Sequence, residues 1–308
     1  MQSMTVSNDN RGHHQTLHVL VNSQAGGAQA NLQVIKDKVN QLANEGLKVH
    51  LHLLQGQKIN RCLEDLADRE SAVVAVGGGD GTVRHAVEVL AGTGHTLAIL
   101  PVGTANLLAR SLEIPLDIEQ ALELAITGKD SNIDAGMVNA RLFFNVCSIG
   151  LYPELARHRE ERRQRHLQWP KFLRWLVDTT VSGIAVLRNW RKFRFKITID
   201  GKAQQNKVIT FAVANNAKLP VFENTKPDKG ELVIYLPQPV SRWGFLVLML
   251  QTIFLHPKDI EMLETQHVQK AKIEIPPETP MSLDGETVHI KGPLNFQSLK
   301  NYCVVRTP

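Results

Sequence analysis

The sequence contains little cysteine: its 308 residues include only Cys62, Cys147 and Cys303, which lie far apart in the chain. Three widely spaced cysteines make neither a disulfide framework nor a CxxC-type zinc site, so we expect a reducing, cytoplasmic setting. Long hydrophobic runs are also missing, because the longest near-continuous one, Trp243–Leu255, is shorter than the roughly 20 residues that span a bilayer. We therefore expect no membrane-spanning helix, and the polar start at Met1–Gln15 is unlike a signal peptide.

Two widespread nucleotide-binding signatures are absent as well. The sequence has no GxxxxGK[ST] loop, no GxGxxG followed by an acidic residue on the next strand, and no protein-kinase motifs. Hydrophobic residues make up 43% of the chain and charged residues 21%, which is typical of a globular protein and excludes disordered, collagen-like and coiled-coil classes. At roughly 150 residues per domain, the length suggests two domains.

Positive charge is concentrated in one segment, Arg157–Lys196. It holds twelve Lys or Arg residues and three acidic residues, whereas the net charge of the whole chain is +5. Such a segment can bind anionic lipid, nucleic acid or a phosphate-bearing ligand, or it can simply be a solvated helix with a basic face. The sequence alone leaves these alternatives open.

The first half of the chain alternates strand-like and helix-like patterns. Buried strands are predicted at Ala72–Val76 and Leu97–Leu100, and apolar residues spaced three and four apart predict a helix over Ala28–Glu45. Gly46 stands where a C-terminal cap of that helix belongs, and further helices are predicted at Ile59–Asp68 and Val83–Ala91. Further strands at Leu17–Asn22 and Lys48–Leu54 complete a β-α-β-α-β-α-β order, which predicts a parallel sheet covered by helices.

The second half has a different rhythm, with short strand-like segments from about Ile133 onward. We expect a mainly β domain of sandwich type, with helices at about Trp169–Leu187 and Arg242–Leu255. The predicted strands are Arg141–Val146, Lys192–Asp200, Lys207–Ala214, Leu232–Leu236, Val268–Ile275 and Thr287–Ile290.

Three glycine-containing loops follow three of the predicted parallel strands. They are Asn22–Gly27 (NSQAGG), Gly77–Thr82 (GGGDGT) and Pro101–Asn106 (PVGTAN). The carboxyl ends of parallel strands share one edge, where glycine lets backbone N–H groups and helix N-termini approach phosphate oxygens. Three loops at one edge therefore predict a phosphate site. Asp80 is the only acid in these loops, and a carboxylate beside polyphosphate implies a bridging Mg²⁺.

Five segments in the same order resemble the catalytic domain of the diacylglycerol kinase family. NSQAGG is similar to the family's NPxSG loop, and VAVGGGDGT at Val74–Thr82 to its GGDGT hallmark. Leu97–Arg110 (LAILPVGTANLLAR) resembles the PxGTxN segment, Ile133–Gly150 the crossover into the second domain, and Leu283–Glu286 (LDGE) the late DGE motif. The family includes bacterial lipid kinases and the diacylglycerol, sphingosine and ceramide kinases.

The resemblance implies a fold and a domain plan. It implies a three-layer α/β domain with a Rossmann-like parallel sheet that binds the nucleotide, followed by a mainly β sandwich domain that binds lipid. In this plan residues 1–14 are a flexible tail, 15–136 the nucleotide-binding domain, 137–294 the lipid-binding domain, and 295–308 a segment that returns to the first domain.

The resemblance also implies an ATP-dependent lipid kinase, with diacylglycerol as one candidate acceptor. Asp80 is expected to act through Mg²⁺, and Glu286, with Asp284 beside it, to orient or deprotonate the lipid hydroxyl. The residues expected to bind the nucleotide are Asn22, Gly26, Gly27, Gly78, Gly79, Gly81, Thr82 and Thr104.

Some positions depart from the family pattern. Ser23 and Ala25 replace Pro and Ser in the first loop, Arg84 and His85 stand where Asn and Glu are common, and Leu107 replaces a frequent Asp. A second metal site found in bacterial members uses an Asp-Gly-x-Leu element, for which this chain has Lys229-Gly230-Glu231-Leu232. Asp228, one residue earlier, is the candidate replacement for the missing ligand.

Three other functions compete with lipid phosphorylation. A catalytically silent lipid-binding or regulatory relative is the main alternative, although Asp80, Asp284 and Glu286 are all retained. An NAD kinase shares GGDGT but not the LDGE and PVGTAN segments, and no fold motif supports nucleic-acid binding. We expect a cytoplasmic protein that associates peripherally with anionic membrane through residues 157–196, where its lipid substrate resides. The oligomeric state is left open.

Overall fold

The computed structural model describes residues 16–150, 193–199, 201–208, 210–215, 230–237, 263–277 and 279–308. The helices expected at 169–187 and 242–255 lie outside this part of the chain. The chain divides into two compact units, of which the first contains residues up to Ser131 together with Cys303–Pro308, and the second contains Asn132–Tyr302.

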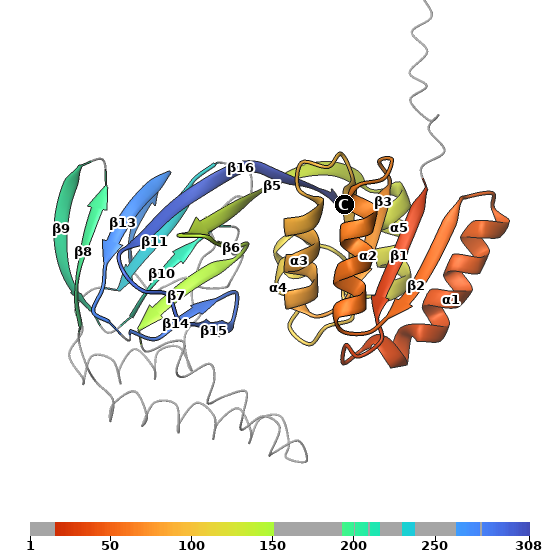
Figure 1. Ribbon diagram of the computed structural model, residues 1–308, viewed down its shortest axis with the longest axis horizontal. Coiled ribbons are helices and arrows are strands. Elements are labelled where there is room, and N and C mark those ends of the chain that lie inside the picture. The colour runs from red at the N-terminus through yellow and green to blue at the C-terminus, as the bar shows by residue number, and fades with distance from the viewer. Residues whose placement is uncertain are drawn as a thin grey trace, which may run out of the picture. The chain divides into compact units, whose positions relative to one another are not determined.

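A parallel sheet forms the middle of the first unit (Figure 1). Its strands follow the order β2 (Val49–Leu54), β1 (Leu17–Asn22), β3 (Val73–Gly77) and β4 (Thr96–Leu100), and every neighbouring pair is parallel. All five residues of β3 and all five of β4 are buried, as the uninterrupted apolar runs predict for central strands. Near the end of the chain, β16 (Leu294–Thr307) pairs in parallel with β4, with Val305 opposite Leu97.

Helices pack on this sheet: α1 (Ala28–Asn44), α2 (Gln57–Ala67), α3 (Asp80–Leu90), α4 (Leu107–Ser111) and α5 (Ile118–Thr127). The β1-α1-β2 and β2-α2-β3 crossovers run in opposite directions, and right-handed connections therefore place α1 and α2 on opposite faces. Helix α1 packs with α5 and α2 with α3, which completes the three layers. The predicted α/β fold of the first unit is confirmed.

Two sheets make up the second unit (Figure 1). The first joins β16, β13 (Lys270–Glu274), β8 (Phe193–Ile199) and β9 (Lys202–Val208), with β5 (Lys129–Val138) and β6 (Arg141–Phe143) beside β16. The second follows the order β12 (Leu263–Val268), β11 (Leu232–Pro237), β10 (Thr210–Ala214), β7 (Val146–Gly150), β14 (Met281–Leu283) and β15 (Glu286–Val288).

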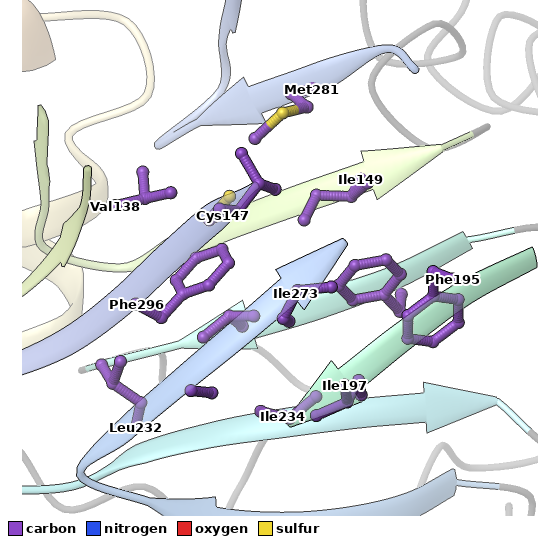
Figure 2. Packing of buried hydrophobic residues seen from close by; sticks show 14 of the residues in the cluster. Val138, Cys147, Ile149, Phe195, Ile197, Leu232, Ile234, Ile273, Met281 and Phe296 are labelled. Carbon is purple, nitrogen blue, oxygen red and sulfur yellow. The ribbon is translucent and has the colours of Figure 1, made fainter. Parts of the chain in front are cut away.

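The two sheets of this unit face each other across one apolar core, which Figure 2 shows from close by. Phe195 on β8 stacks on Phe211 of β10 with ring centroids 4.5 Å apart, and Phe143 meets Phe296 edge to face at 6.2 Å. Burying a large apolar side chain contributes on the order of 1.5–3 kcal/mol, so these inward positions hold the sandwich together. The predicted mainly β second domain is confirmed.

Two of the three cysteines are buried, and Cys62 is half-buried. All three cysteines are free thiols. Burial raises the pKa of Cys147, and burial also raises the pKa of Cys303 to about 12, so neither is a reactive thiolate at neutral pH. Among the helices of the described residues, none is long and apolar enough to span a bilayer.

Candidate functional site

The three glycine loops meet at one edge of the sheet in the first unit. Strands β1, β3 and β4 are parallel neighbours, so their carboxyl ends deliver residues 22–27, 77–82 and 101–106 to the same edge. The strand order alone predicts this convergence. The structure adds the contacts that fix the loops to one another.

The first and third loops are joined through Gly27. Its N–H donates to the Val102 carbonyl oxygen over 2.9 Å, and a Cβ on Gly27 would lie only 3.0 Å from that oxygen. Asn31 Nδ2 donates to the Gly27 carbonyl at 2.8 Å and fixes the start of α1. The neighbouring Gly26 is exposed, and its added Cβ would come within 3.6 Å of Thr104 Oγ1. Gly27 is therefore required by a close backbone approach, and Gly26 and Thr104 lie next to each other at the surface.

The second and third loops are packed together even more tightly. A Cβ on Gly103 would lie 2.9 Å from both the Gly78 carbonyl oxygen and the Gly79 Cα. A Cβ on Gly78 would lie 2.5 Å from Thr82 Cβ, so only glycine fits there. Gly103 lets the two loops approach each other, and Gly78 lets the second loop fold back on its own Thr82. Both are structural tasks in addition to any contact with phosphate.

Asn106 closes the third loop, and the site prediction did not include it. It adopts a left-handed conformation with φ of 50°, and its Oδ1 accepts the Gly103 N–H at 2.9 Å. Its Nδ2 donates to the carbonyl oxygens of Pro101 and Gly103 at 3.1 and 2.9 Å. The available signal was an Asn after a glycine turn, because Asn tolerates left-handed backbone and bonds to its own loop.

Asp80 connects the second loop to α4. Its Oδ1 accepts the Leu107 N–H at 2.6 Å and its Oδ2 accepts the Asn106 N–H at 3.2 Å. The carboxylate thus stabilises the start of α4 while standing in the first turn of α3. Each carboxylate oxygen has a second lone pair that these hydrogen bonds do not use. The half-buried carboxylate can therefore also coordinate a metal ion.

The start of α3 can receive an anion. Gly79 is its N-cap residue and offers no side chain, so the first N–H groups of the helix have no side-chain cap. A Cβ built on Gly79 meets nothing within 4 Å, which shows open space at this point. Gly81 and Thr82 follow in the first turn, where the helix dipole favours negative charge. These features fit a phosphate group.

Among the described residues, Arg110 is a cation held against the third loop. Arg110 is exposed, and its Nε donates to the Ala105 carbonyl at 3.0 Å, which holds its guanidinium beside the third loop. Arg84 and His85 instead lie 3.9 and 4.0 Å from Glu88 carboxylate oxygens on the same helix. Arg110 was only part of a quoted motif in the sequence analysis, and its hydrogen bond to the third loop makes it a candidate cation for a bound phosphate.

No cluster of three or more His, Cys, Asp or Glu side chains suited to a metal exists among the described residues. Asp80 supplies the one carboxylate of the three loops. This donor set fits Mg²⁺, which commonly binds one or two carboxylates together with phosphate oxygens and water.

The first loop contributes one further predicted residue, Asn22. Its Oδ1 accepts the Gln24 N–H at 3.1 Å and so shapes the turn.

The acidic motif LDGE lies in the second unit, in the turn between β14 and β15. Asp284 and Gly285 both have positive φ, 48° and 91°, as a two-residue hairpin of this type requires. Asp284 Oδ2 accepts the Phe144 N–H at 2.8 Å. Its Oδ1 accepts the N–H groups of Asn145 and Val146 at 2.8 and 2.9 Å.

Asp284 is therefore an anchor for the backbone that leads into β7. A carboxylate that accepts three N–H groups is held in one orientation and stabilises that backbone. Glu286, two residues later, is exposed at the start of β15, where its position opposite Leu283 is fixed by the hairpin. The two acids are neighbours in the motif but have different surroundings in the structure.

The candidate second metal site lies mostly outside the described residues, because Asp228 and Lys229 belong to the part left undescribed. The structure describes Gly230, whose N–H donates to Asp134 Oδ2 at 2.7 Å. Asp134 is 2% exposed, and its Oδ1 accepts the Asn301 N–H at 2.8 Å. Sequence reasoning did not single out Asp134, since its partners lie 96 and 167 residues away.

Comparison with protein families identifies residues 16–138 as a match to the diacylglycerol kinase catalytic domain. The matched range contains all three glycine loops and Asp80. The resemblance drawn from the motifs is confirmed.

Individual relatives carry related names. The chain is 28% identical to the "Diacylglycerol kinase" of Bacillus subtilis over 238 residues, which cover 72% of this chain and 74% of that protein. It is 33% identical to the "Probable lipid kinase YegS-like" of Klebsiella pneumoniae over 152 residues. That match covers 48% of this chain and about half of the relative, 51%.

A solved structure shares the fold. The crystal structure of a diacylglycerol kinase from Bacillus anthracis superimposes with a TM-score of 0.71 and 22% sequence identity. The alignment covers 96% of this chain and 97% of that one. At this identity the similarity concerns the fold.

Proposed function

We propose that this protein phosphorylates a lipid hydroxyl with ATP, and the proposal starts from the match of residues 16–138 to the diacylglycerol kinase catalytic domain. The observation that carries the proposal is the edge of the first sheet. Three interlocked glycine loops, an uncapped start of α3 and Asp80 meet there, and together they suit a Mg²⁺-bound polyphosphate.

In this proposal the backbone of the glycine loops binds the phosphates. Gly79 leaves open space before α3, and Gly26 and Thr104 are exposed neighbours in the first and third loops. Backbone N–H groups at the start of α3 donate to phosphate oxygens, and Arg110 adds a positive charge. Phosphoryl transfer needs little covalent help, so holding and neutralising the phosphates supplies most of the acceleration.

Asp80 is the proposed ligand of the metal. Mg²⁺, when bound with ATP, neutralises charge that develops on the phosphate oxygens. Asp80 is suited to hold it because the Asn106 and Leu107 N–H groups fix the carboxylate between α3 and α4.

Glu286 is the proposed base or orienting group for the acceptor. In the reaction the lipid oxygen bonds to the γ-phosphorus, the bond between that phosphorus and the leaving ADP oxygen breaks, and the hydroxyl proton goes to a base. Glu286 is exposed at the hairpin and can accept that proton. Asp284, held by three N–H groups, keeps the hairpin in place. Diacylglycerol is the first acceptor to test, because the family and the Bacillus subtilis relative carry its name.

The experiment measures transfer of labelled γ-phosphate to lipids dispersed in detergent, first diacylglycerol and then a total lipid extract. The full-length protein should give a labelled lipid product that needs Mg²⁺. Glu286→Gln should lower transfer by about 10²-fold or more, in line with loss of a general base, while ATP affinity stays nearly unchanged.

Glu264→Gln is the matched control, because Glu264 is an exposed glutamate of the same unit. It should leave transfer unchanged. A large loss of ATP binding in Glu286→Gln would instead place this hairpin in the nucleotide site. The absence of any labelled product from the full extract would favour a silent lipid-binding relative.

A further inference from the structure

One face of the second unit is strongly basic. In β8 and β13, Phe195, Ile197 and Ile273 point into the core, as Figure 2 shows. Since side chains alternate along a strand, the residues between them lie on the opposite, outward face. The register places Arg194 opposite Lys207 and Lys272 beside Thr198 on that face.

We call this surface the basic face and define it by the outward positions of β9, β8 and β13. Its charged members are five cations and one acid, namely Arg194, Lys196, Lys207, Lys270, Lys272 and Glu274. All of the cations are exposed except Lys196, which is half-buried.

The positive charge of the basic face is largely unneutralised. Lys196 and Lys272 share Glu274, at 3.8 and 3.9 Å from the same carboxylate oxygen. In the described part of the chain, neither Arg194, Lys207 nor Lys270 forms an ion pair. Arg194 and Lys207 even stand directly across from each other, although like charges in that position destabilise a sheet. Fold stability therefore does not explain this arrangement.

Polar side chains suited to an anion lie at one border of the face. A hollow of about 430 Å³ is lined there by Lys270 and Lys272 together with Thr198, Asn139, Asn295 and Gln297. The register explains the grouping, because Lys270 is opposite Gln297 and Lys272 is opposite Asn295. Ammonium and amide N–H groups around one hollow can donate to a phosphate oxygen.

We propose that the basic face docks on an anionic lipid bilayer and that the hollow receives a lipid headgroup phosphate. The proposal rests on the proposed function, since a long-chain lipid acceptor stays in the membrane and the protein must reach it there. Charge complementarity argues for this occupant: each Lys or Arg near an anionic surface contributes on the order of 1 kcal/mol of attraction. Neighbouring strands also present their cations side by side, which suits a broad surface.

Nucleic acid is the competing anionic partner. Single-stranded nucleic acid is bound by stacking bases on exposed aromatic side chains. The described outward positions of β8, β9 and β13 carry none, since Phe195 lies in the core. A lipid surface offers charge without a need for stacking and fits the face better.

Arg194 and Lys196 also belong to the basic segment 157–196 that the sequence analysis expected to meet membrane. Residues 157–192 lie outside the described part of the chain. The basic face extends that expectation to β9 and β13, which are far from the segment in sequence.

The test is co-sedimentation of the full-length protein with phosphatidylcholine vesicles. One set of vesicles contains about 30 mol% phosphatidylglycerol, which makes the surface anionic, and the other contains none. Wild type should bind only the anionic vesicles and should lose binding as salt is raised. The triple variant Lys207→Glu, Lys270→Glu and Lys272→Glu should bind about 100-fold more weakly. The triple variant Lys48→Glu, Lys58→Glu and Lys129→Glu, with the same charge change at exposed positions of the first unit, should bind much more strongly than the face variant.

Kinase assays distinguish a failure of membrane docking from a failure of the proposed function. The face variant should still phosphorylate detergent-dispersed short-chain lipid at the wild-type rate, and its circular dichroism should match wild type. Equal vesicle binding by the two triple variants would overturn the proposal, as would displacement from vesicles by short single-stranded RNA at equal charge. A wild type that binds vesicles yet phosphorylates no lipid would refute the proposed function and leave the docking intact.

Discussion

Asp80 and Asp284 each hold a backbone segment in place with a single carboxylate. Asp80 accepts two N–H groups within its own unit, and Asp284 accepts three. The glycine motif made Asp80 a predictable site residue. The anchoring role of Asp284 was not predictable, because its donors lie about 140 residues earlier in the chain. An Asp-Gly pair in the sequence indicates a turn and does not reveal which distant N–H groups the side chain reaches.

Replacing Asp80 tests its proposed role at the metal. Asp80→Asn should lower turnover by about 10²-fold or more, since charge positioning has effects of that size in phosphoryl transfer. Because the new amide turns an NH₂ group toward one of two N–H donors, we also expect a loss of stability of about 1–3 kcal/mol. Turnover is measured at a temperature where circular dichroism shows the variant folded, over a series of Mg²⁺ concentrations.

Asp117→Asn provides the matched control for that substitution. Asp117 is the N-cap of α5 and accepts the Gln120 N–H at 3.0 Å, a task that Asn performs equally well. The control should keep full turnover and nearly full stability. Turnover close to wild type in Asp80→Asn would remove this residue from the mechanism.

Among the elements, the central strands and the first two helices were predictable. The apolar runs predicted β3 and β4 to within one residue, and the apolar spacing predicted α1 with the correct start and an end one residue too late. Gly46 takes a φ of 93° after α1, as the expected C-terminal cap requires.

Other elements differ from the prediction for physical reasons. Helix α3 begins at Asp80, three residues before the expected Val83, because Gly81 and Thr82 form its first turn once Gly79 acts as the N-cap. Helices α4 and α5 were not expected, since α4 has only five residues and depends on Asp80 for its first N–H bonds. Most of the expected strand over 268–275 is β13. Val268 is instead the last residue of β12, which belongs to the other sheet.

Two glycines in the loop cluster separate packing from phosphate binding. Gly79→Ala should leave the melting temperature within a few degrees, because its Cβ meets nothing within 4 Å. The same methyl enters the space before α3, so nucleotide affinity should fall about 10-fold, because Gly there lets the backbone approach phosphate closely. Gly103→Ala should lower both stability and affinity, since its Cβ would press on the Gly78 oxygen at 2.9 Å.

Thermal unfolding and titration with a Mg²⁺–nucleotide complex measure both effects. The two variants carry the same chemical change and differ only in the space around it. Wild-type nucleotide affinity in a stable Gly79→Ala variant would place the phosphates elsewhere than at the start of α3.

At the scale of the whole molecule, the fold class of each unit was predictable from the sequence pattern. The return of the last strand to the first unit was not. The β-α-β order fixes a parallel sheet, and short alternating strands fix a sandwich. A return of residues 295–308 to the first domain was only implied by family resemblance. The structure shows one strand, β16, whose early residues pair with β13 and whose Val305 pairs with β4. A pairing between residues more than 200 positions apart has no local pattern, so the sequence alone cannot specify it.

Stability of the whole molecule should also depend on a histidine cluster at the edge of the first sheet. His18 on β1 lies 3.4 Å from His52 of β2, measured from Nδ1 to Nε2, and its ring stacks on His50 with centroids 4.9 Å apart. Burial, and then the charges of His50 and His52, lower the pKa of His18 to about 4. The charged groups that also face it are Arg69 and His95, and both act in the same direction.

Acid should therefore weaken the fold in a pH range above that of ordinary carboxylates. Well above pH 6.5, His18 is neutral in both the folded and the unfolded chain and has no effect on stability. As the pH falls from 6.5 toward 4, the unfolded chain takes up a proton that folded His18 refuses, so the free energy of unfolding decreases. His52, whose pKa is also lowered, chiefly by burial, adds to the decrease.

His18→Gln removes one of these protons and should flatten the decline of melting temperature between pH 6.5 and about 5, where carboxylates are still ionised. At pH 7.5 the variant and wild type should melt within a few degrees of each other, because the histidine is then uncharged in both states. Circular dichroism melts at half-unit pH steps measure the two slopes. The slope can differ by at most about one proton per molecule from this residue, and less because its ring keeps some contact with water. An identical acid slope in His18→Gln would show that the cluster does not resist protonation.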